Sequence, residues 1–272
     1  MTGMTGMTAV SATDSPRVGL LEGLRQTATL AWRTLVQIRH NPWELGDFSF
    51  QPILFLLLFT YVFGGAISGS TGEYLTFTLP GIIVMNLVFV TMYVGLGLNT
   101  DLTKGVFDRL RSLPIARWAP LTGRIIADLV KQLWSIVLLL GVGMILGFRI
   151  GTNVAGVIAA VALLLFFALA FSWVAVLVGV LAKDPEKVQL FGFTALFPVT
   201  FVSNVFVPEE TMPGWLQAVV KINPVTILSD ATRGLLVGGP VARPVMGTLV
   251  WSVAIVAIFA PLAVWGFKRR GT

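Results

Sequence analysis

Three ionisable side chains lie together at the start of an otherwise apolar run, where they could move a proton or bind an ion. Asp128 follows Arg124 by four residues and precedes Lys131 by three. On a helix this spacing brings the three side chains to one face, where Asp128 can form ion pairs near a membrane boundary. A proton relay normally uses deeper, paired acidic residues. A proton-coupled carrier, with Asp128 as its best candidate, is therefore the weaker hypothesis.

Residues for other kinds of chemistry are scarce. The chain has no cysteine and a single histidine, His40, which excludes disulfides and cysteine nucleophiles and nearly excludes a zinc site. The sequence contains no G-x-x-x-x-G-K-[ST] phosphate loop, no H-E-x-x-H motif and no Ser/His/Asp constellation. We therefore predict no catalytic residue, no metal site and no cofactor on this chain.

The composition is that of a membrane protein. Of 272 residues, 56% are hydrophobic and only 12% are charged, against about 25% charged in an average soluble domain. The mean hydropathy is +0.85. So few charges cannot cover the surface of a soluble globule of this size. The composition thus excludes a soluble domain, and the net charge of +6 has to be explained by orientation in a membrane or by nucleic acid.

Six apolar segments are long enough, or nearly long enough, to cross a bilayer, which takes about 20 residues. Pro198 interrupts the fifth segment, so its boundary is the hardest to place. The prediction is an all-α integral membrane protein with six transmembrane helices and both termini on one side. The segments are Phe50 to Ile67, Leu79 to Leu98, Ile125 to Phe148, Val154 to Ala182, Val188 to Phe206, and Met246 to Phe267.

The distribution of Lys and Arg predicts that both termini are cytoplasmic, because cytoplasmic loops carry an excess of these residues. The segments on the side of the termini hold most of them: Arg17, Arg25, Arg33, Arg39, Lys104, Arg109, Arg111, Arg117, Arg124, Lys183, Lys187, Lys268, Arg269 and Arg270. The opposite side holds Arg149, Lys221, Arg233 and Arg243. The positive charge then needs no nucleic-acid partner, and we predict none.

Residues 1–19 are small, polar and repetitive, and we expect a disordered tail. A single permease-like membrane domain should fill residues 20–272. Within it, residues 20–41 show a helical period of apolar residues with Trp32 as an interfacial anchor, which predicts a helix on the cytoplasmic membrane surface. A plain anchor with no partner is the alternative.

The longest internal cytoplasmic loop, residues 101–124, contains a short amphipathic pattern. Val106, Leu110 and Leu113 share one face, and Pro114 should end the helix. A helix with an apolar stripe and arginines suits docking into a groove of a partner. A solvated loop whose arginines only set the orientation is the alternative, and composition alone favours it.

The segment between the fifth and sixth spans, residues 207–244, is too polar and proline-rich for a span and too apolar for a free loop. Two short helices in the outer interface fit this pattern best. Non-helical backbone at that depth must be shielded by protein or water. We expect the segment to line or cap a cavity. An interfacial cover that only packs is the alternative.

Three stretches together resemble the permease subunits of type-2 ABC exporters, and most closely the daunorubicin/doxorubicin-resistance group. They are FGGAISGSTGEYLTFTLPGIIVMN at residues 63–86, KGVFDRLRSLPIAR at residues 104–117, and VPEETMPGWLQAVVKINPVTILSDATRGLLVG at residues 207–238. The resemblance implies a permease dimer that works with two separate ATP-binding subunits. Those partner chains would bind ATP and Mg.

The resemblance also assigns roles to residues. The cytoplasmic stretch would be a coupling helix that contacts the ATPase through Asp108, Arg109, Arg111, Ser112, Pro114 and Arg117. It starts Thr103-Lys104-Gly105, whereas the family often has a Glu-rich start, which could alter the ATPase it accepts. Short re-entrant helices would close the outer end of the path through Pro208, Glu209, Pro213, Trp215, Asn223, Pro224, Asp230 and Arg233.

The implied function is export of a hydrophobic or amphipathic substrate, a drug, antibiotic or lipid-like molecule, across the cytoplasmic membrane. Apolar and aromatic walls with a few polar groups should form the path. The candidates are Phe55, Phe59, Asn86, Tyr93, Phe193, Phe197 and Asn204, each of which could instead be ordinary span packing. Export of a lipid-linked glycan or cell-envelope lipid and an ATP-independent carrier are the alternatives.

Overall fold

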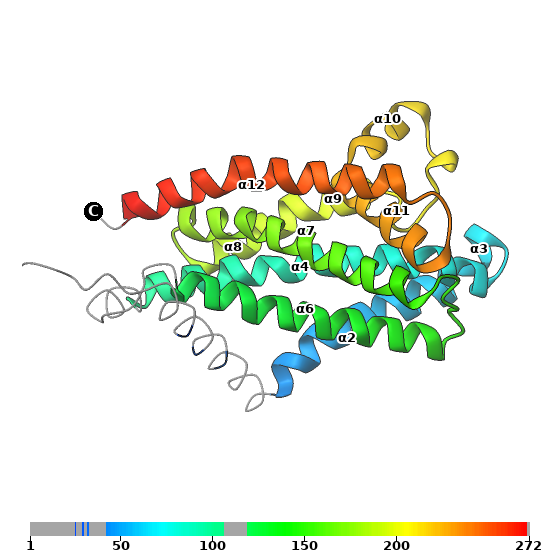
Figure 1. Cartoon of the computed structure of the whole chain (residues 1–272), viewed down its shortest axis with the longest axis horizontal. Helices are drawn as coiled ribbons and strands as arrows, with labels where there is room; N and C mark the ends of the chain where they lie inside the picture. The colour runs from blue at the N-terminus through cyan, green and yellow to red at the C-terminus, as the bar shows by residue number, and fades with distance from the viewer. Residues whose placement is uncertain (1–24, 26–28, 30–31, 33–41, 106–118, 271–272) are drawn as a thin grey trace, which may run out of the picture.

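The computed structural model describes residues 25, 29, 32, 42–105 and 119–270 (Figure 1), and every regular element within them is a helix. Two of the elements are π-helices, η1 and η2, and η3 is a 3-10 helix. The elements are α2 Pro42–Leu58, η1 Phe59–Phe63, α3 Gly64–Ser68, α4 Thr71–Thr103, α6 Ala119–Ile145, α7 Val154–Leu181, α8 Pro185–Phe191, η2 Gly192–Leu196, α9 Phe197–Phe201, η3 Glu209–Thr211, α10 Gly214–Ile222, α11 Pro224–Val237 and α12 Ala242–Arg270.

Five helical stretches are long and apolar enough to cross a membrane: Phe50–Ser68, Thr71–Thr103, Gly123–Ile145, Val154–Leu181 and Ala242–Phe267. They coincide with five of the six predicted spans, so the all-helical membrane class is confirmed. The fifth predicted span is a helical run in three short pieces of seven, five and five residues, which ends at Phe201. The sixth crossing therefore stays a prediction.

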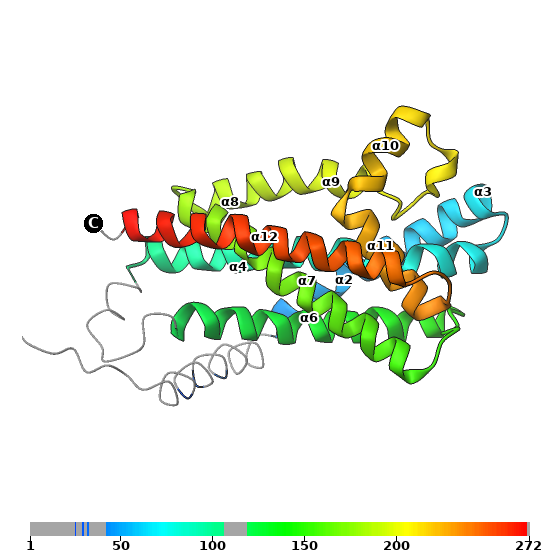
Figure 2. The ribbon, with the colours of Figure 1, turned by 45° about the horizontal axis from the view of Figure 1, so that its top comes forward.

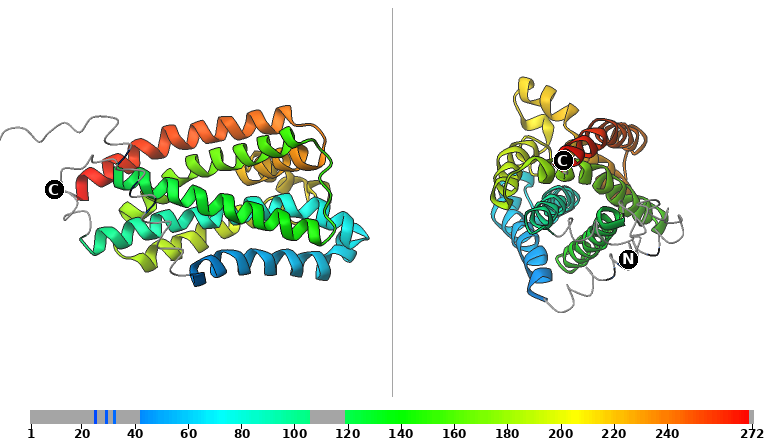
Figure 3. Two further views of the ribbon diagram at one scale, coloured as in Figure 1. Left: turned by 60° about the horizontal axis from the view of Figure 1, so that its bottom comes forward. Right: turned by 90° about the vertical axis from the view of Figure 1, so that its left-hand side faces the viewer.

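Helix α4 forms the centre of the bundle. About 72% of its most apolar stretch is buried inside the protein, against 17% for α12. It packs against α2, α6, α7, α8 and α11, and the end-on view in Figure 3 shows the other long helices around it. Figure 2 shows α10 projecting from one end, with the C-terminus of α12 at the other. These are called here the α10 end and the C-terminal end.

Glycines allow α4 and α7 to approach backbone to backbone. A Cβ at Gly95 would collide with the carbonyl of Ala175, and one at Gly179 would collide with the carbonyl of Gly95. Next to this contact, the buried Asn99 of α4 donates hydrogen bonds to the carbonyls of Gly179 (2.9 Å) and Ala182 (2.7 Å). Small residues that permit close approach, together with an interhelical amide, are how helices associate in a membrane.

Several sequence predictions fall outside the described residues. The tail at residues 1–19 is one of them, and most of the interfacial helix at residues 20–41 is another. Of the latter, residues 25, 29 and 32 are helical, and the Thr29 hydroxyl donates to the Arg25 carbonyl over 2.9 Å. The coupling residues Asp108, Arg109, Arg111, Ser112, Pro114 and Arg117 also lie outside the described residues.

Candidate functional site

A cavity of about 250 Å³ lies between α2, the middle of α4 and the run α8–η2–α9. Aromatic rings and methionines make up much of its wall, three side-chain amides contribute polarity, and none of the lining side chains is charged. Phe193 remains 64% exposed, so the cavity opens to the surface of the bundle. The lining residues are Gln51, Pro52, Phe55, Met85, Asn86, Phe89, Val90, Met92, Tyr93, Leu96, Val188, Gln189, Gly192, Phe193, Phe197 and Phe201.

Most of the residues predicted for the substrate path come together here. Phe55, Asn86, Tyr93, Phe193 and Phe197, from three separate parts of the chain, all line the cavity. The two other candidates lie elsewhere: Phe59 packs beside the cavity, and Asn204 joins a polar network near the α10 end.

An unbroken row of aromatic rings leads from the cavity towards the α10 end. Phe55 stacks on Phe59 with centroids 5.9 Å apart, and Phe59 stacks on Phe206 at 4.2 Å. Phe206 in turn lies 5.1 Å from Phe201, which stacks on Phe197 at 4.1 Å. Offset stacking of this kind adds to the energy of apolar burial. The row forms an apolar surface that links the cavity to the segment after α9.

The polar side of the cavity is supported from behind by α6. Asn86 donates a 2.7 Å hydrogen bond to the Ser135 hydroxyl, and one turn closer to the C-terminal end Gln132 donates to Thr91 over 3.1 Å. Ser135 and Gln132 are both buried. These contacts hold the Asn86 amide between two spans, so that a polar group is kept at a fixed place in an apolar wall.

The chain after α9 is not helical between residues 202 and 207, although much of it is buried. Side chains of α4 satisfy its exposed carbonyls, because Thr78 donates to Val205 and Tyr74 donates to Phe206, each over 3.0 Å. Gly81 lets this backbone pass, since a Cβ there would lie 2.9 Å from the backbone of Val205. Irregular backbone is tolerated inside a membrane protein only with such partners.

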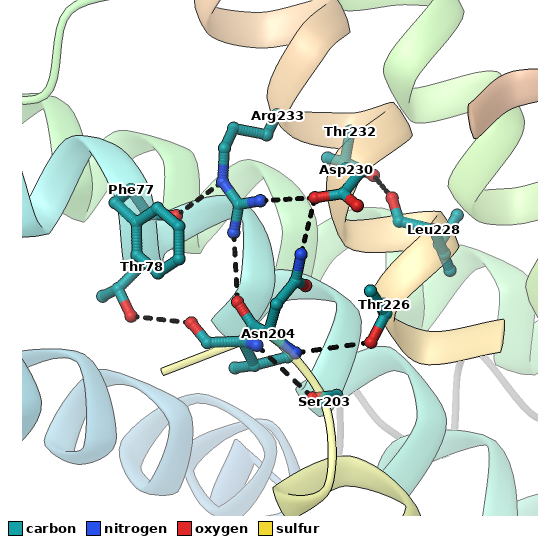
Figure 4. A network of polar contacts seen from close by, with 10 residues as sticks. Phe77, Thr78, Ser203, Asn204, Thr226, Leu228, Asp230, Thr232 and Arg233 are labelled. Atoms are coloured by element: carbon teal, nitrogen blue, oxygen red, sulfur yellow. Dashed lines mark hydrogen bonds and ion pairs between the residues drawn. The ribbon is translucent and has the colours of Figure 1, made fainter. Parts of the chain in front are cut away.

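Arg233 of α11 forms the centre of this polar network (Figure 4). Its guanidinium donates to the Phe77 carbonyl (3.0 Å), the Asp230 carboxylate (2.7 Å) and the Asn204 carbonyl (3.3 Å), and it lies 4.1 Å from the Phe77 ring centroid. Asn204 also donates to Asp230 over 2.7 Å. Burial lowers the pKa of Arg233, and the neighbouring Asp230 carboxylate acts against that shift. The network ties α4, α11 and the non-helical segment together.

Asn223 and Pro224 explain each other's place at the start of α11. The Asn223 side chain accepts a hydrogen bond from the backbone N–H of Val225 at 2.8 Å and so caps the helix, and Pro224 fills the first helical position, where no N–H is needed. The same amide donates to the carbonyls of Val199 (2.7 Å) and Val202 (2.6 Å) at the end of α9. One side chain thus begins one helix and ends another.

The structure divides the residues predicted for the outer region into two groups. Asn223, Asp230 and Arg233 belong to the contacts around α11. Pro208 precedes η3, which begins with Glu209, and Pro213 precedes α10, where the side chain of Trp215 is 73% exposed. None of the latter four takes part in the hydrogen bonds of the Arg233 network that the described residues form.

Sequence reasoning missed the network partners on α4 and part of α11. Tyr74 and Thr78 lie one turn apart on α4, and Thr226 accepts a 3.3 Å hydrogen bond from the backbone N–H of Asn204. The signal was a pair of hydroxyl side chains four residues apart at the start of a span, which places both on one face.

The ionisable group at the start of α6 is only partly as predicted. Lys131 and Asp128 form an ion pair at 3.5 Å, both with largely buried side chains. Arg124, however, forms its ion pair with Asp101 of α4. The spacing alone would equally have allowed an Arg124–Asp128 pair on α6.

Comparison with known proteins gives a consistent result. Residues 25–237 match the family model described as ABC-2 type transporter. The chain is 40% identical to a daunorubicin resistance ABC transporter permease protein of Streptomyces coeruleorubidus over 97% of this chain and 92% of that protein. A probable doxorubicin resistance ABC transporter permease protein of Mycobacterium tuberculosis is 29% identical over 81% of this chain and 80% of its own length.

Proposed function

The chain belongs to the ABC-2 type transporter family, since the family model and the 40% identical relative each cover most of it, and we propose that it is the transmembrane subunit of an ATP-driven exporter. In this proposal two copies pair with two separate ATP-binding subunits. The complex moves a hydrophobic or amphipathic molecule of the drug, antibiotic or lipid-like class out across the cytoplasmic membrane.

The cavity between α2, α4 and α8–η2–α9 is the observation that supports this function best. Ligand pockets are mostly apolar with a few placed polar groups, which describes a wall of phenylalanines around Asn86. Its 250 Å³ is just below the usual range of about 300–1,000 Å³. Because the cavity is open at Phe193, a second copy of the chain facing that opening would enlarge and close it.

The partner subunit follows from the sequence. No phosphate loop is present in these 272 residues, so the proposal assigns ATP and Mg²⁺ to a separate chain. Contact with that chain would occur through residues 104–117 at the C-terminal end, which the excess of Lys and Arg places in the cytoplasm. The α10 end then faces outwards, where the Arg233 network and α10 would close the path.

Two alternatives have some support. A lipid-linked glycan needs many hydrogen-bonding groups, and the cavity offers only the amides of Gln51, Asn86 and Gln189 and the Tyr93 hydroxyl, which favours a less polar substrate. The Asp128–Lys131 pair within a predicted span is the feature that an ATP-independent carrier would use. Transport driven by a proton gradient in vesicles without any ATPase would establish the carrier instead.

The proposal is tested by purifying the tagged chain in mild detergent with whatever ATP-binding chain accompanies it. The reconstituted complex is then assayed for ATPase stimulation by daunorubicin, the compound named for the 40% identical relative, and by a lipid-linked glycan. Phe193→Ala should weaken stimulation by the drug. Phe191→Ala is the matched control, because Phe191 is also exposed and lies two residues away but does not line the cavity.

Two results would contradict the proposal. A chain that purifies without an ATP-binding partner and transports solute without ATP would overturn the exporter. Equal effects of Phe193→Ala and Phe191→Ala would leave the exporter standing but would remove the cavity from the substrate path.

A further inference from the structure

At the C-terminal end of the bundle, α4 and α6 are joined by one ion pair. Arg124 of α6 crosses to α4 and pairs with Asp101, with side chains that are 28% and 36% exposed. Arg124 also occupies the space above Gly97, where a Cβ would collide with the guanidinium. Gly97 and Asp101 lie four residues apart and therefore on the same face of α4. A missing side chain and a carboxylate together hold one arginine.

This pair closes the base of the segment between the two helices. Asp101 lies in the last turn of α4, which ends at Thr103, and the helix is stopped at Gly105, whose φ is +66°. Arg124 lies in the second turn of α6, which begins at Ala119. Both partners are thus held by regular helix, and everything between them, residues 102–123, emerges from a single joined stem.

The same part of α4 is joined to α7 on another face. Asn99, two residues before Asp101, donates to the carbonyls of Gly179 and Ala182 at the end of α7. Just beyond Ala182, Asp184 caps α8, whose residues Val188 and Gln189 line the cavity. Movement of the α4–α6 stem would therefore be passed through Asn99 to the start of the helix that forms one cavity wall.

We propose that Gly97, Asp101 and Arg124 form a clamp that makes the ends of α4 and α6 move as one body, and that this clamp is needed to couple ATP hydrolysis to transport. The inference rests on the proposed exporter function and adds positioning residues to it. A partly exposed ion pair contributes little to overall stability. Loss of the clamp should therefore affect coupling more than folding.

The test uses the reconstituted complex of the full chain with its ATP-binding partner and measures daunorubicin transported per ATP hydrolysed. Arg124→Gln and Asp101→Asn should each leave basal ATPase intact and lower this ratio about fivefold, the size of a typical coupling effect. The exchange Asp101→Arg with Arg124→Asp should restore it. Lys187→Gln, which removes the exposed Asp184–Lys187 pair at 3.2 Å on the same end, is the control and should leave the ratio unchanged.

A chemical bridge tests directly whether the two helices move together. Because the chain has no cysteine, Asp101→Cys with Arg124→Cys introduces only the intended thiols. This variant should be uncoupled, and bridging its thiols with a short bis-methanethiosulfonate reagent should restore transport per ATP until reductant is added. Gly97→Ala, which keeps both charges and displaces the arginine, should reproduce the uncoupling in a chain of native charge.

The outcomes separate the clamp from the exporter. Wild-type coupling in the single variants, no rescue by the charge exchange, or inhibition by the bridge would each overturn the clamp while ATP-driven transport by the wild type stands. Absence of ATP-driven transport by the wild-type complex would instead overturn the proposed function.

Discussion

The Asn86 amide in the cavity wall is held by Ser135, a residue outside the cavity, through a hydrogen bond of 2.7 Å. Asn86→Ala should weaken drug binding about fivefold by removing a polar contact, and Ser135→Ala about twofold by releasing the amide, as expected for single hydrogen bonds. Binding is measured by tryptophan quenching or equilibrium dialysis of the detergent-solubilised complex. Ser172→Ala is the control, since this buried serine bonds only within α7. A larger loss for Ser135→Ala than for Asn86→Ala would contradict the arrangement.

Arg233 should be required for the stability of the α10 end. Arg233→Gln leaves the carbonyls of Phe77 and Asn204 and the Asp230 carboxylate short of a donor, which should cost about 2 kcal/mol of stability. The measurement is the apparent midpoint of thermal unfolding in detergent. Arg243→Gln, at an exposed arginine near the start of α12, should have no effect, and an equal loss there would indicate a general charge effect.

Close contact of α4 with α7 predicts a different kind of sensitivity. Gly179→Ala adds a methyl group against the Gly95 carbonyl, so it should lower the free energy of unfolding by about 2 kcal/mol through overpacking. Gly141→Ala on α6 adds the same methyl group where nothing lies within 4 Å. Alanine is the better helix former, so this control should be neutral or stabilising. Comparable destabilisation by both variants would show that the α4–α7 contact can relax.

The start of α8 should respond to acid. The backbone N–H of Lys187 donates to the Asp184 carboxylate, and this bond, followed by the Lys187 side chain, holds the pKa of Asp184 below its ordinary value of 3.8. A carboxylate with a lowered pKa stabilises the folded state above its unfolded pKa, and that contribution is lost as the pH falls through the folded value.

Hydrogen exchange of the first turn of α8 should therefore speed up below pH 3.8 in the wild type. Asp184→Asn keeps a capping side chain and should remove the pH dependence. Asp184→Ala should exchange fast at every pH. An acid response that persists in Asp184→Asn would assign the titration to another group.

Hydropathy is sufficient to predict the long helices, because a span must be apolar over most of its length whatever it packs against. Val154–Leu181 begins at the predicted residue and ends one residue before the predicted end. The span predicted for α4 is too short at both ends, since Thr71–Thr103 continues through polar residues that find partners in the folded chain.

The cavity is largely predictable from the sequence and the polar network is not. Phe193 and Phe197 lie one turn apart and share a wall, and the period of a continuous helix would extend that wall to Asn204. The helix ends at Phe201, however, and the chain turns, so Asn204 meets Asp230 instead. Its partners are brought by tertiary packing from α4 and α11, which no local pattern encodes.

The two π-helices place a constraint on chain length rather than on side-chain chemistry. Each π-turn is equivalent to one extra residue inserted into an α-helix, and η2 lies directly before the cavity residues Phe197 and Phe201. Deleting a single residue from Gly192–Leu196 would allow plain α-helix and rotate α9 by about 100° relative to Phe191. The aromatic rings would then leave the wall without any of them being substituted. This region should therefore accept many amino-acid exchanges while rejecting any gap in its length.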